Sequence, residues 1–394
     1  MPPPVPGPPR QPGPTRQPGL VHGMGTSLVP ATWPALDDAE VQEVLAGYVG
    51  CLGPGVATAR PVWHSPRPMS AGGLVEVGTT TVFVKRHDPR VRSIASLRTE
   101  HRLAAHLRRR GVAVPKVVVA DDGSTVAQVA GGLYEVFARA RGEDLYAEVP
   151  SWHPYASTRH AAAAGSALAR FHVAAAGFDA ADRAFGPLVS SVVLAGSSDP
   201  GAALDRLLEA RPALAAALDR AGAAGAVHRH CVPALERASR VLRHRPRGWA
   251  HGDWHPSNLT WWGRGPTASV AEVLDLGLSN RTAAVHDVAV ALERSFVPWL
   301  SGPGTRLADV DGVDAFLEGY GVRRSWGAGG WRDVADVLPA CHVEYALSEV
   351  EYFATVAGSD ADAALAANDY LIGHCRYFEE GEGAALLEHL RTKA

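Results

Sequence analysis

Two short segments contain residue types that could carry out phosphoryl transfer. Residues 251–258 read His-Gly-Asp-Trp-His-Pro-Ser-Asn, and Asp-Leu-Gly follows at 275–277. Phosphoryl transfer needs a base that orients the acceptor hydroxyl and oxygen ligands for Mg²⁺. Asp253 suits the base, and Asn258, five residues later, suits a metal ligand. Asp275 ends a strand-like run and would present a second, hard oxygen ligand. The spacing therefore predicts a kinase.

A third element upstream is expected to bind the nucleotide phosphates. Lys85 is one of three lysines among 38 basic residues, and it ends the β-branched run 79–85, which predicts a strand. Glu100 lies fifteen residues later in a predicted helix, with Ser93 as its N-cap. Kinases use a strand lysine held by a helix glutamate to grip the α- and β-phosphates. We therefore expect Lys85 and Glu100 to form such a pair.

The pattern His251-Gly-Asp-x-His255, with Asn258 and Asp275-x-Gly277 after it, resembles the aminoglycoside phosphotransferase and choline kinase family. The resemblance covers roughly residues 60 to 380 and implies a relative of the protein kinases in which Gly replaces the Arg of His-Arg-Asp. It implies that His251 and His255 shape the catalytic loop through hydrogen bonds. Asp287, early in the following helix, is expected to anchor that loop.

The order of predicted elements gives an α+β, two-lobed, protein-kinase-like fold. Residues 1–34, with eleven prolines and no acidic residue, predict a disordered leader. We expect residues 35–139 to form a small lobe with a mainly antiparallel sheet and one helix, and residues 140–394 to form a mostly helical catalytic and substrate-binding lobe. Glu135 and Phe137 lie where the hinge that contacts the nucleotide base is expected. No Gly-x-Gly-x-x-Gly loop precedes the strand lysine, so the sequence does not identify the residues that cover the phosphates.

These features predict an ATP-dependent phosphotransferase that uses Mg²⁺ and a small-molecule hydroxyl acceptor, with GTP as an alternative donor. A catalytically silent nucleotide-binding relative that acts through a partner is a second possibility. A protein kinase is disfavoured by Gly252 and by the lack of an Ala-Pro-Glu segment after Asp275.

The acceptor is not fixed by the sequence. The resemblance implies aminoglycosides or other antibiotics, with resistance as a possible role, or else amino alcohols, amino acids or sugars. Residues 301–394 carry sixteen acidic and seven basic side chains, which gives a slight preference to a cationic acceptor. Glu344, Glu349 and Glu351 are the principal candidates to bind it, together with Asp369 and Tyr370.

Composition excludes several other classes. The sequence contains no run of eighteen apolar residues, so no membrane span is expected. The four cysteines form no Cys-x-x-Cys pair, so neither a zinc site nor a disulfide framework is expected, and a reducing, cytoplasmic location is favoured. The basic clusters lack interleaved aromatic residues, so no nucleic-acid partner is expected. The oligomeric state is left open.

Overall fold

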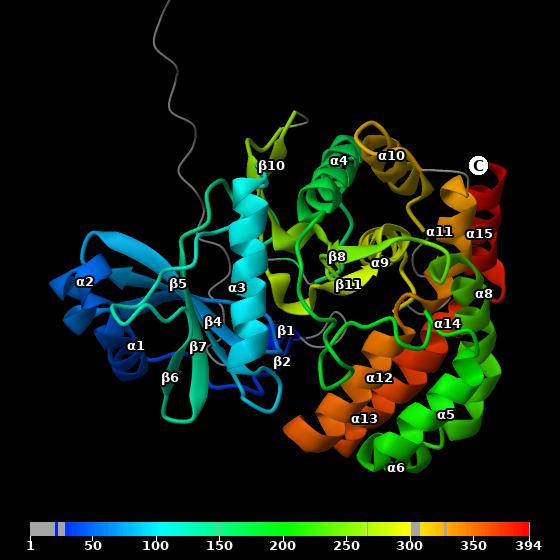
Figure 1. Ribbon diagram of the computed structural model, residues 1–394, viewed down its shortest axis with the longest axis horizontal. Helices are drawn as coiled ribbons and strands as arrows, with labels where there is room; N and C mark the ends of the chain where they lie inside the picture. Colours follow the sequence, from blue (N-terminus) through cyan, green and yellow to red (C-terminus); the bar gives the residue numbers. More distant parts are fainter. Residues whose placement is uncertain are drawn as a thin grey trace, which may run out of the picture.

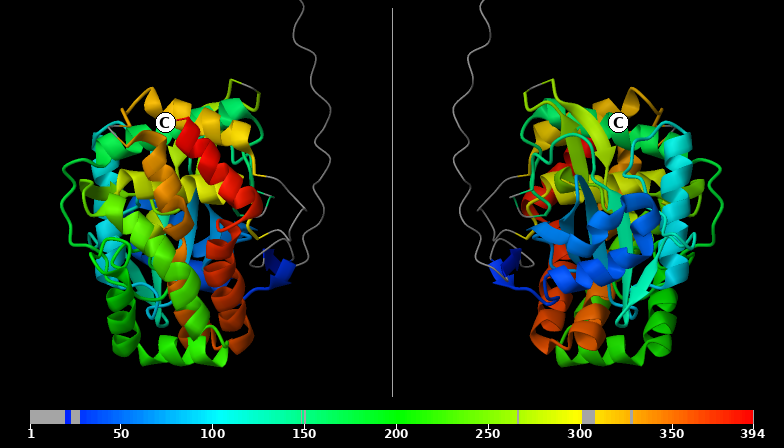
Figure 2. Two further views of the ribbon diagram at one scale, coloured as in Figure 1. Left: turned by 90° about the vertical axis from the view of Figure 1, so that its right-hand side faces the viewer. Right: turned by 90° about the vertical axis from the view of Figure 1, so that its left-hand side faces the viewer.

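The computed structural model describes residues 20–22, 28–147, 149, 151–265, 267–300, 308–326 and 329–393. A sheet lobe lies beside a larger helical lobe (Figure 1), and the two views of Figure 2 look onto the helical lobe and the sheet lobe in turn. The two-lobed α+β architecture predicted from the sequence is confirmed. No helix in the described ranges has the length and apolar character needed to cross a bilayer.

The sheet of the smaller lobe is antiparallel and five-stranded, in the order β3-β4-β5-β7-β6. Its central strand alternates, so that Val82 and Val84 enter a core shared with the helix α1 while Lys85 points to the opposite face. This alternation directs the lysine towards α3 and the helical lobe. The elements of this lobe are α1 (Asp38–Leu45), α2 (Val49–Leu52), β3 (Arg60–His64), β4 (Ala71–Val77), β5 (Thr80–His87), α3 (Ile94–Arg109), β6 (Ala127–Val129) and β7 (Gly132–Ala138).

Helix α3 begins where the sequence predicts. Ser93 accepts a hydrogen bond from the backbone of Ser96, and the Ser96 hydroxyl accepts one from the Ser93 backbone, which forms a capping box. Buried positions recur every three or four residues along the helix, and they include Glu100 and His101 among leucines. The helix therefore places one buried glutamate on the face that looks towards the other lobe.

The larger lobe packs its helices around two short strand pairs. Helices α4 and α10 approach closely because Gly165 and Gly319 have no side chain; a Cβ at either position would clash with a carbonyl oxygen of the other helix. The strand pairs are β8 (Arg247–Ala250) with β11 (Asn280–Ala283) and β9 (Leu259–Trp262) with β10 (Ser269–Val273). The principal helices are α4 (Thr158–Ala175), α5 (Pro200–Ala210), α6 (Pro212–Arg220), α8 (Val232–Leu242), α9 (Ala284–Phe296), α10 (Val310–Gly321), α11 (Gly330–Val337), α12 (Val343–Tyr352), α13 (Asp360–Leu365), α14 (His374–Tyr377) and α15 (Gly381–Thr392).

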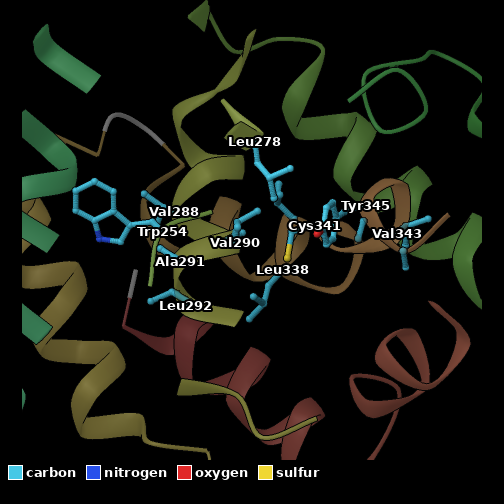
Figure 3. Close-up of a cluster of buried hydrophobic side chains, with 14 of the residues drawn as sticks. Trp254, Leu278, Val288, Val290, Ala291, Leu292, Leu338, Cys341, Val343 and Tyr345 are labelled. Atoms are coloured by element: carbon cyan, nitrogen blue, oxygen red, sulfur yellow. The ribbon is translucent and has the colours of Figure 1, made fainter. Parts of the chain in front are cut away.

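One apolar cluster fixes the helices that flank the strand pairs. Trp254, which precedes β9, packs fully buried with the apolar face of α9, and α12 contributes Val343 and Tyr345 (Figure 3). Polar residues carried on α9 and on the β8–β9 connection are thus held by a rigid core.

Ordered structure begins inside the segment expected to be a disordered leader. The short strands β1 (Leu20–His22) and β2 (Leu28–Pro30) pair antiparallel, and the Trp33 indole donates a hydrogen bond to the Tyr352 hydroxyl, 3.0 Å away. The partly buried Trp33 side chain also packs against the hydrophobic clusters of both lobes. The remainder of that leader, residues 1–19 and 23–27, lies outside the described residues.

Candidate active site

The loop between β8 and β9 is held by one buried carboxylate. Asp287, on α9, accepts hydrogen bonds from the backbone N–H groups of His251 (2.9 Å) and Gly252 (2.7 Å) and from the His172 ring (2.8 Å). Burial opposes its ionisation, but the His172 contact and the Gly252 amide outweigh it and lower the pKa of Asp287 to about 2. Asp287 thus lies where we expect a loop anchor.

Gly252 meets two requirements that only glycine satisfies. Its φ is +77°, and a Cβ at this position would clash with the Leu278 carbonyl oxygen. The loop can therefore run directly against the segment after Asp275. This explains in physical terms why a glycine precedes Asp253.

The two histidines of the loop are neutral and structural. His251 donates from Nε2 to the Leu274 carbonyl (2.9 Å) and accepts at Nδ1 from the Asp253 amide (3.2 Å). Burial lowers its pKa, and burial together with the charge of Arg67 lowers the pKa of His255 to about 3. Both rings therefore hold the loop in shape without carrying charge.

Both carboxylate oxygens of Asp253 have polar partners. The Asn258 amide nitrogen donates to its Oδ2 (3.0 Å) and to its backbone carbonyl (2.9 Å), while Arg294 forms an ion pair with Oδ1. The Asp253 side chain is 18% exposed, so it stays within reach of a ligand. Sequence reasoning missed Arg294. It lies seven residues after Asp287, and this spacing of two helical turns places both side chains on the loop-facing side of α9.

Lys85 and Asp275 meet across the two lobes. The Lys85 ammonium lies 2.9 Å from Asp275 Oδ2, and Asp275 Oδ1 accepts a hydrogen bond from the Gly277 amide (3.1 Å). Burial disfavours the charged lysine, yet the attraction of Asp275 prevails and raises the pKa of Lys85. Asp275 itself adopts a left-handed backbone with φ +50°, an uncommon conformation that turns its carboxylate towards the lysine.

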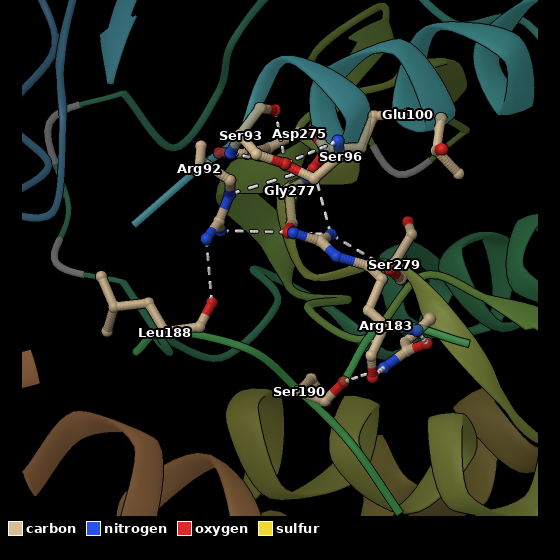
Figure 4. A network of polar contacts seen from close by, with 12 residues as sticks. Arg92, Ser93, Ser96, Glu100, Arg183, Leu188, Ser190, Asp275, Gly277 and Ser279 are labelled. Carbon is tan, nitrogen blue, oxygen red and sulfur yellow. Dashed lines mark hydrogen bonds and ion pairs between the residues drawn. The ribbon is translucent and has the colours of Figure 1, made fainter. Parts of the chain in front are cut away.

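The expected pair of Lys85 with Glu100 is not found among the described contacts. Glu100 instead lies 3.0 Å from the Arg183 guanidinium and 3.9 Å from that of Arg92. Both arginines donate to the Gly277 carbonyl, at 2.7 and 3.0 Å (Figure 4). Lys85 pairs with Asp275, whereas Glu100 pairs with two arginines whose positions along the chain do not predict this contact.

This arrangement gives Glu100 a different task. Burial raises its pKa to about 7, against the opposing charge of Arg183. Through the two arginines it links α3 of the small lobe to the segment that follows Asp275. Glu100 therefore positions the Asp275 segment indirectly.

Glu135 is also committed to protein contacts. Its carboxylate lies 2.6 Å from Nε2 of both His87 and His101, and burial is outweighed by these rings, so that its pKa is lowered. It is the cross-strand neighbour of Lys85 in the β5–β7 ladder. Phe137 packs edge-on against the His101 ring at 5.9 Å. Contacts of Glu135 and Phe137 with a nucleotide stay a prediction.

Part of the expected hinge backbone is already used. The Val136 carbonyl accepts from the Val118 amide, and the Ala138 amide donates to the Lys116 carbonyl, both at 2.8 Å. A nucleotide base would therefore have to use backbone groups other than these two.

The three glutamates predicted to bind the acceptor have different surroundings. Glu344 is a structural anchor, because its carboxylate accepts from three successive amides of residues 193–195 and from the Ser191 hydroxyl. Glu351 is paired with Arg211 at 2.6 Å. Glu349 alone is fully buried without a hydrogen-bond partner. Of the further candidates, Asp369 is exposed and Tyr370 is buried.

The residues predicted to hold Mg²⁺ have the right donor chemistry. The nitrogen of the Asn258 amide is bound to Asp253, which leaves the Oδ1 atom for a ligand, and Asp275 offers a carboxylate beside the lysine. Amide and carboxylate oxygens are the groups that Mg²⁺ prefers. The two side chains therefore fit the ion.

Comparison with known proteins gives a family match and solved structures with a similar fold. The model of the phosphotransferase enzyme family (APH) matches residues 74–335, well over half of the chain. The structure of a microcompartment-associated aminopropanol kinase is similar, with a TM-score of 0.57 and 19% identity over 89% of this chain and 100% of that one. An aminoglycoside phosphotransferase from Alicyclobacillus acidocaldarius subsp. acidocaldarius DSM 446 has a TM-score of 0.50 and 15% identity, covering 84% and 92% of the two chains. No protein with a curated description matches the sequence.

Proposed function

Because this chain belongs to the phosphotransferase enzyme family, we propose that it is a small-molecule kinase that transfers the γ-phosphoryl group of ATP to a hydroxyl. One observation carries the proposal. Asp253, bound to Asn258, and the cross-lobe pair of Lys85 and Asp275 supply together the base, the metal ligands and the phosphate-binding cation that this reaction needs.

Each side chain of the site has a separate role in the proposed reaction. Asp253 accepts the proton of the acceptor hydroxyl, and its carboxylate is oriented by Asn258 and Arg294. Lys85 exchanges its contact with Asp275 for the nucleotide phosphates. Asn258 Oδ1 and the Asp275 carboxylate would hold Mg²⁺, which neutralises phosphate charge when bound. GTP is the alternative donor.

The acceptor is proposed as a small organic molecule with a free hydroxyl. The aminopropanol kinase and the aminoglycoside phosphotransferase that share the fold are named for amine-bearing acceptors. Antibiotics of that kind, amino alcohols, amino acids and sugars are therefore the first compounds to test. An antibiotic acceptor would make resistance the biological role.

A cytoplasmic location is proposed as well. All four cysteines, Cys51, Cys231, Cys341 and Cys375, are free thiols in the structure. Three of them are buried, which suits a reducing compartment.

The test is a phosphate-transfer screen of hydroxyl-bearing antibiotics and metabolites, read by mass, with ATP and GTP in parallel. The wild-type chain should add one phosphoryl group to at least one acceptor, and Asp253→Ala should lose this activity while it still binds nucleotide. A chain that binds nucleotide but phosphorylates nothing in a broad screen, or an Asp253→Ala variant with full turnover, would refute the proposal.

A further inference from the structure

An open cavity of about 340 Å³ lies where the end of α3 meets α4 and the end of α10. Helix α4 runs between the other two helices (Figure 1), so the walls of this cavity come from both lobes. Its volume is in the range of small-molecule sites. None of the side chains assigned to the nucleotide, the metal or the acceptor lines it. We call it the arginine cavity; its charged side chains are Arg110, Arg170 and Arg323, and its apolar ones are Val112, Val173 and Ala174.

The three arginines come from three separate elements and have no acidic partner. Arg110 directly follows α3, Arg170 lies on α4, and Arg323 lies two residues after α10. No acidic residue lines the cavity, and no carboxylate of the described ranges forms an ion pair with any of the three guanidiniums. Exposed arginines elsewhere in the chain do have such partners, as Arg220 does in Asp360 at 3.0 Å. The cavity therefore concentrates positive charge in a chain whose net charge is -3.

Protein contacts position two of the guanidiniums and leave most of their donors unused. Arg110 Nη2 donates to the Ala176 carbonyl at the end of α4 (3.1 Å), and Arg323 Nε donates to the Ser166 hydroxyl (3.3 Å). Ser166 lies one helical turn before Arg170, so Arg323 lies beside Arg170 on the same face of α4. Within the described part of the chain, the other nitrogens of these two guanidiniums and all those of Arg170 have no hydrogen-bond partner. The cavity thus presents several donors to a ligand.

The positive charges of Arg170 and Arg323 repel each other. Burial, and after it this repulsion, lowers the pKa of the Arg170 guanidinium from its usual value. Arginine stays protonated at neutral pH even so. An anion between two such groups replaces repulsion by attraction, and the planar guanidinium fork matches the oxygens of a phosphate with paired hydrogen bonds. The arrangement therefore favours an anion.

Charge and shape narrow the class of anion. A phosphate monoester carries close to two negative charges at pH 7, which suits three guanidiniums better than the single charge of a carboxylate does. The rest of the wall is apolar, and it includes Val173 on α4, which is 58% exposed. Covering such a side chain with an apolar group is favourable. A phosphate that carries an organic part therefore fits the cavity better than inorganic phosphate.

We propose that the arginine cavity binds a small phosphate monoester, with the phosphate between its three arginines and the organic part against Val112 and Val173. This site is additional to the nucleotide site and goes beyond the proposed kinase function. Arg110 belongs to the small lobe and the other two arginines belong to the helical lobe. A bound ester would therefore connect the two lobes.

The first experiment is isothermal titration calorimetry on the full chain, without Mg²⁺ and at constant ionic strength, with phenyl phosphate, inorganic phosphate and benzoate as probes. Phenyl phosphate should bind roughly tenfold more tightly than benzoate, because its second charge strengthens the hydrogen bonds from the guanidiniums. It should also bind several times more tightly than inorganic phosphate, because its ring covers apolar surface. Equal affinity for phenyl phosphate and either of the other probes, or no saturable binding of phenyl phosphate, overturns the proposal.

Two variants test the arginines themselves. Arg170→Gln and Arg323→Gln should each weaken the binding of phenyl phosphate roughly tenfold. Both side chains are exposed, so circular dichroism should show an unchanged fold. Arg159→Gln removes an exposed arginine from the first turn of the same helix, outside the cavity, and as the control it should change the affinity less than about twofold. Affinity unchanged in both cavity variants contradicts the proposal.

A last comparison separates this site from the nucleotide site, which is also expected to bind phosphates. Lys85→Met, and a saturating non-hydrolysable ATP analogue with Mg²⁺ on the wild type, should each change the affinity for phenyl phosphate less than about twofold. Loss of binding in Lys85→Met, or complete displacement by the analogue, would place the anion in the nucleotide site and overturn the proposal. The measurement with the analogue needs only the wild type, so it decides even where an arginine variant fails to fold.

Discussion

Replacing Glu349 by Gln should stabilise the protein, and more so as the pH rises. The side chain is fully buried with no hydrogen-bond partner, and burial raises its pKa from 4.5 to about 8. The unfolded chain therefore releases this proton near pH 4.5, whereas the folded chain keeps it until about pH 8. Between these values the folded state binds more protons, so wild-type stability falls as pH rises and then levels off.

The magnitude follows from the size of the shift. One pKa unit corresponds to ~1.4 kcal/mol, and pH 7 lies 2.5 units above the ordinary pKa of 4.5. The burial of Glu349 should therefore lower the free energy of unfolding of the wild type by roughly 3 kcal/mol at pH 7, relative to its value near pH 4. Glutamine has nearly the same shape and no charge. The free energy of unfolding of Glu349→Gln should therefore equal that of the wild type near pH 4 and exceed it by roughly 3 kcal/mol at pH 7.

Urea unfolding followed by circular dichroism from pH 4 to pH 8.5 measures this difference directly. Glu351→Gln is the control, because Glu351 is already paired with Arg211 and should show no rising gain. Parallel stability curves for Glu349→Gln and the wild type across this range would show that the folded state does not raise the pKa of Glu349.

Three further predictions concern the active-site scaffold. Gly252→Ala should cost at least ~2 kcal/mol and abolish transfer, because of its positive φ and the clash with Leu278; thermal melting and the transfer assay check this, and a stable, active variant would contradict it. Arg183→Lys should lower kcat/KM roughly tenfold, because an ammonium cannot bind Glu100 and the Gly277 carbonyl with a planar fork; steady-state kinetics with varied ATP test it, and unchanged kinetics would disprove it. Lys85→Met should raise the KM for ATP at least tenfold, with a fold unchanged by circular dichroism; an unaltered KM would argue against phosphate binding by Lys85.

Local motifs were the part of the site that the sequence could predict. Asp253 and Asn258 lie on one tight loop, so five residues of spacing suffice to fix their contact. Asp275 follows a strand that pairs with the strand after that loop, so its approach is also set by near neighbours. The alternation of side chains along β5 was enough to predict that Lys85 points away from the core that Val82 and Val84 enter.

Partners from distant segments could not be predicted. Glu100 has two arginines within reach, and Arg183 is 83 positions away in the sequence, so spacing gave no reason to prefer it over Lys85. Glu344 and Glu349 are both acidic residues on one helix. Only the tertiary structure shows that backbone amides satisfy the first and that nothing satisfies the second.

The role of Asp253 as the base is tested by single-turnover phosphoryl transfer with the wild type and with Asp253→Asn, using the best acceptor from the screen. Nucleotide affinity is measured on both proteins by calorimetry. Asp253→Asn should lower the transfer rate at least ~10²-fold and keep its nucleotide affinity within about threefold of the wild type. A variant that transfers phosphate at the wild-type rate would contradict the assignment of Asp253 as the base.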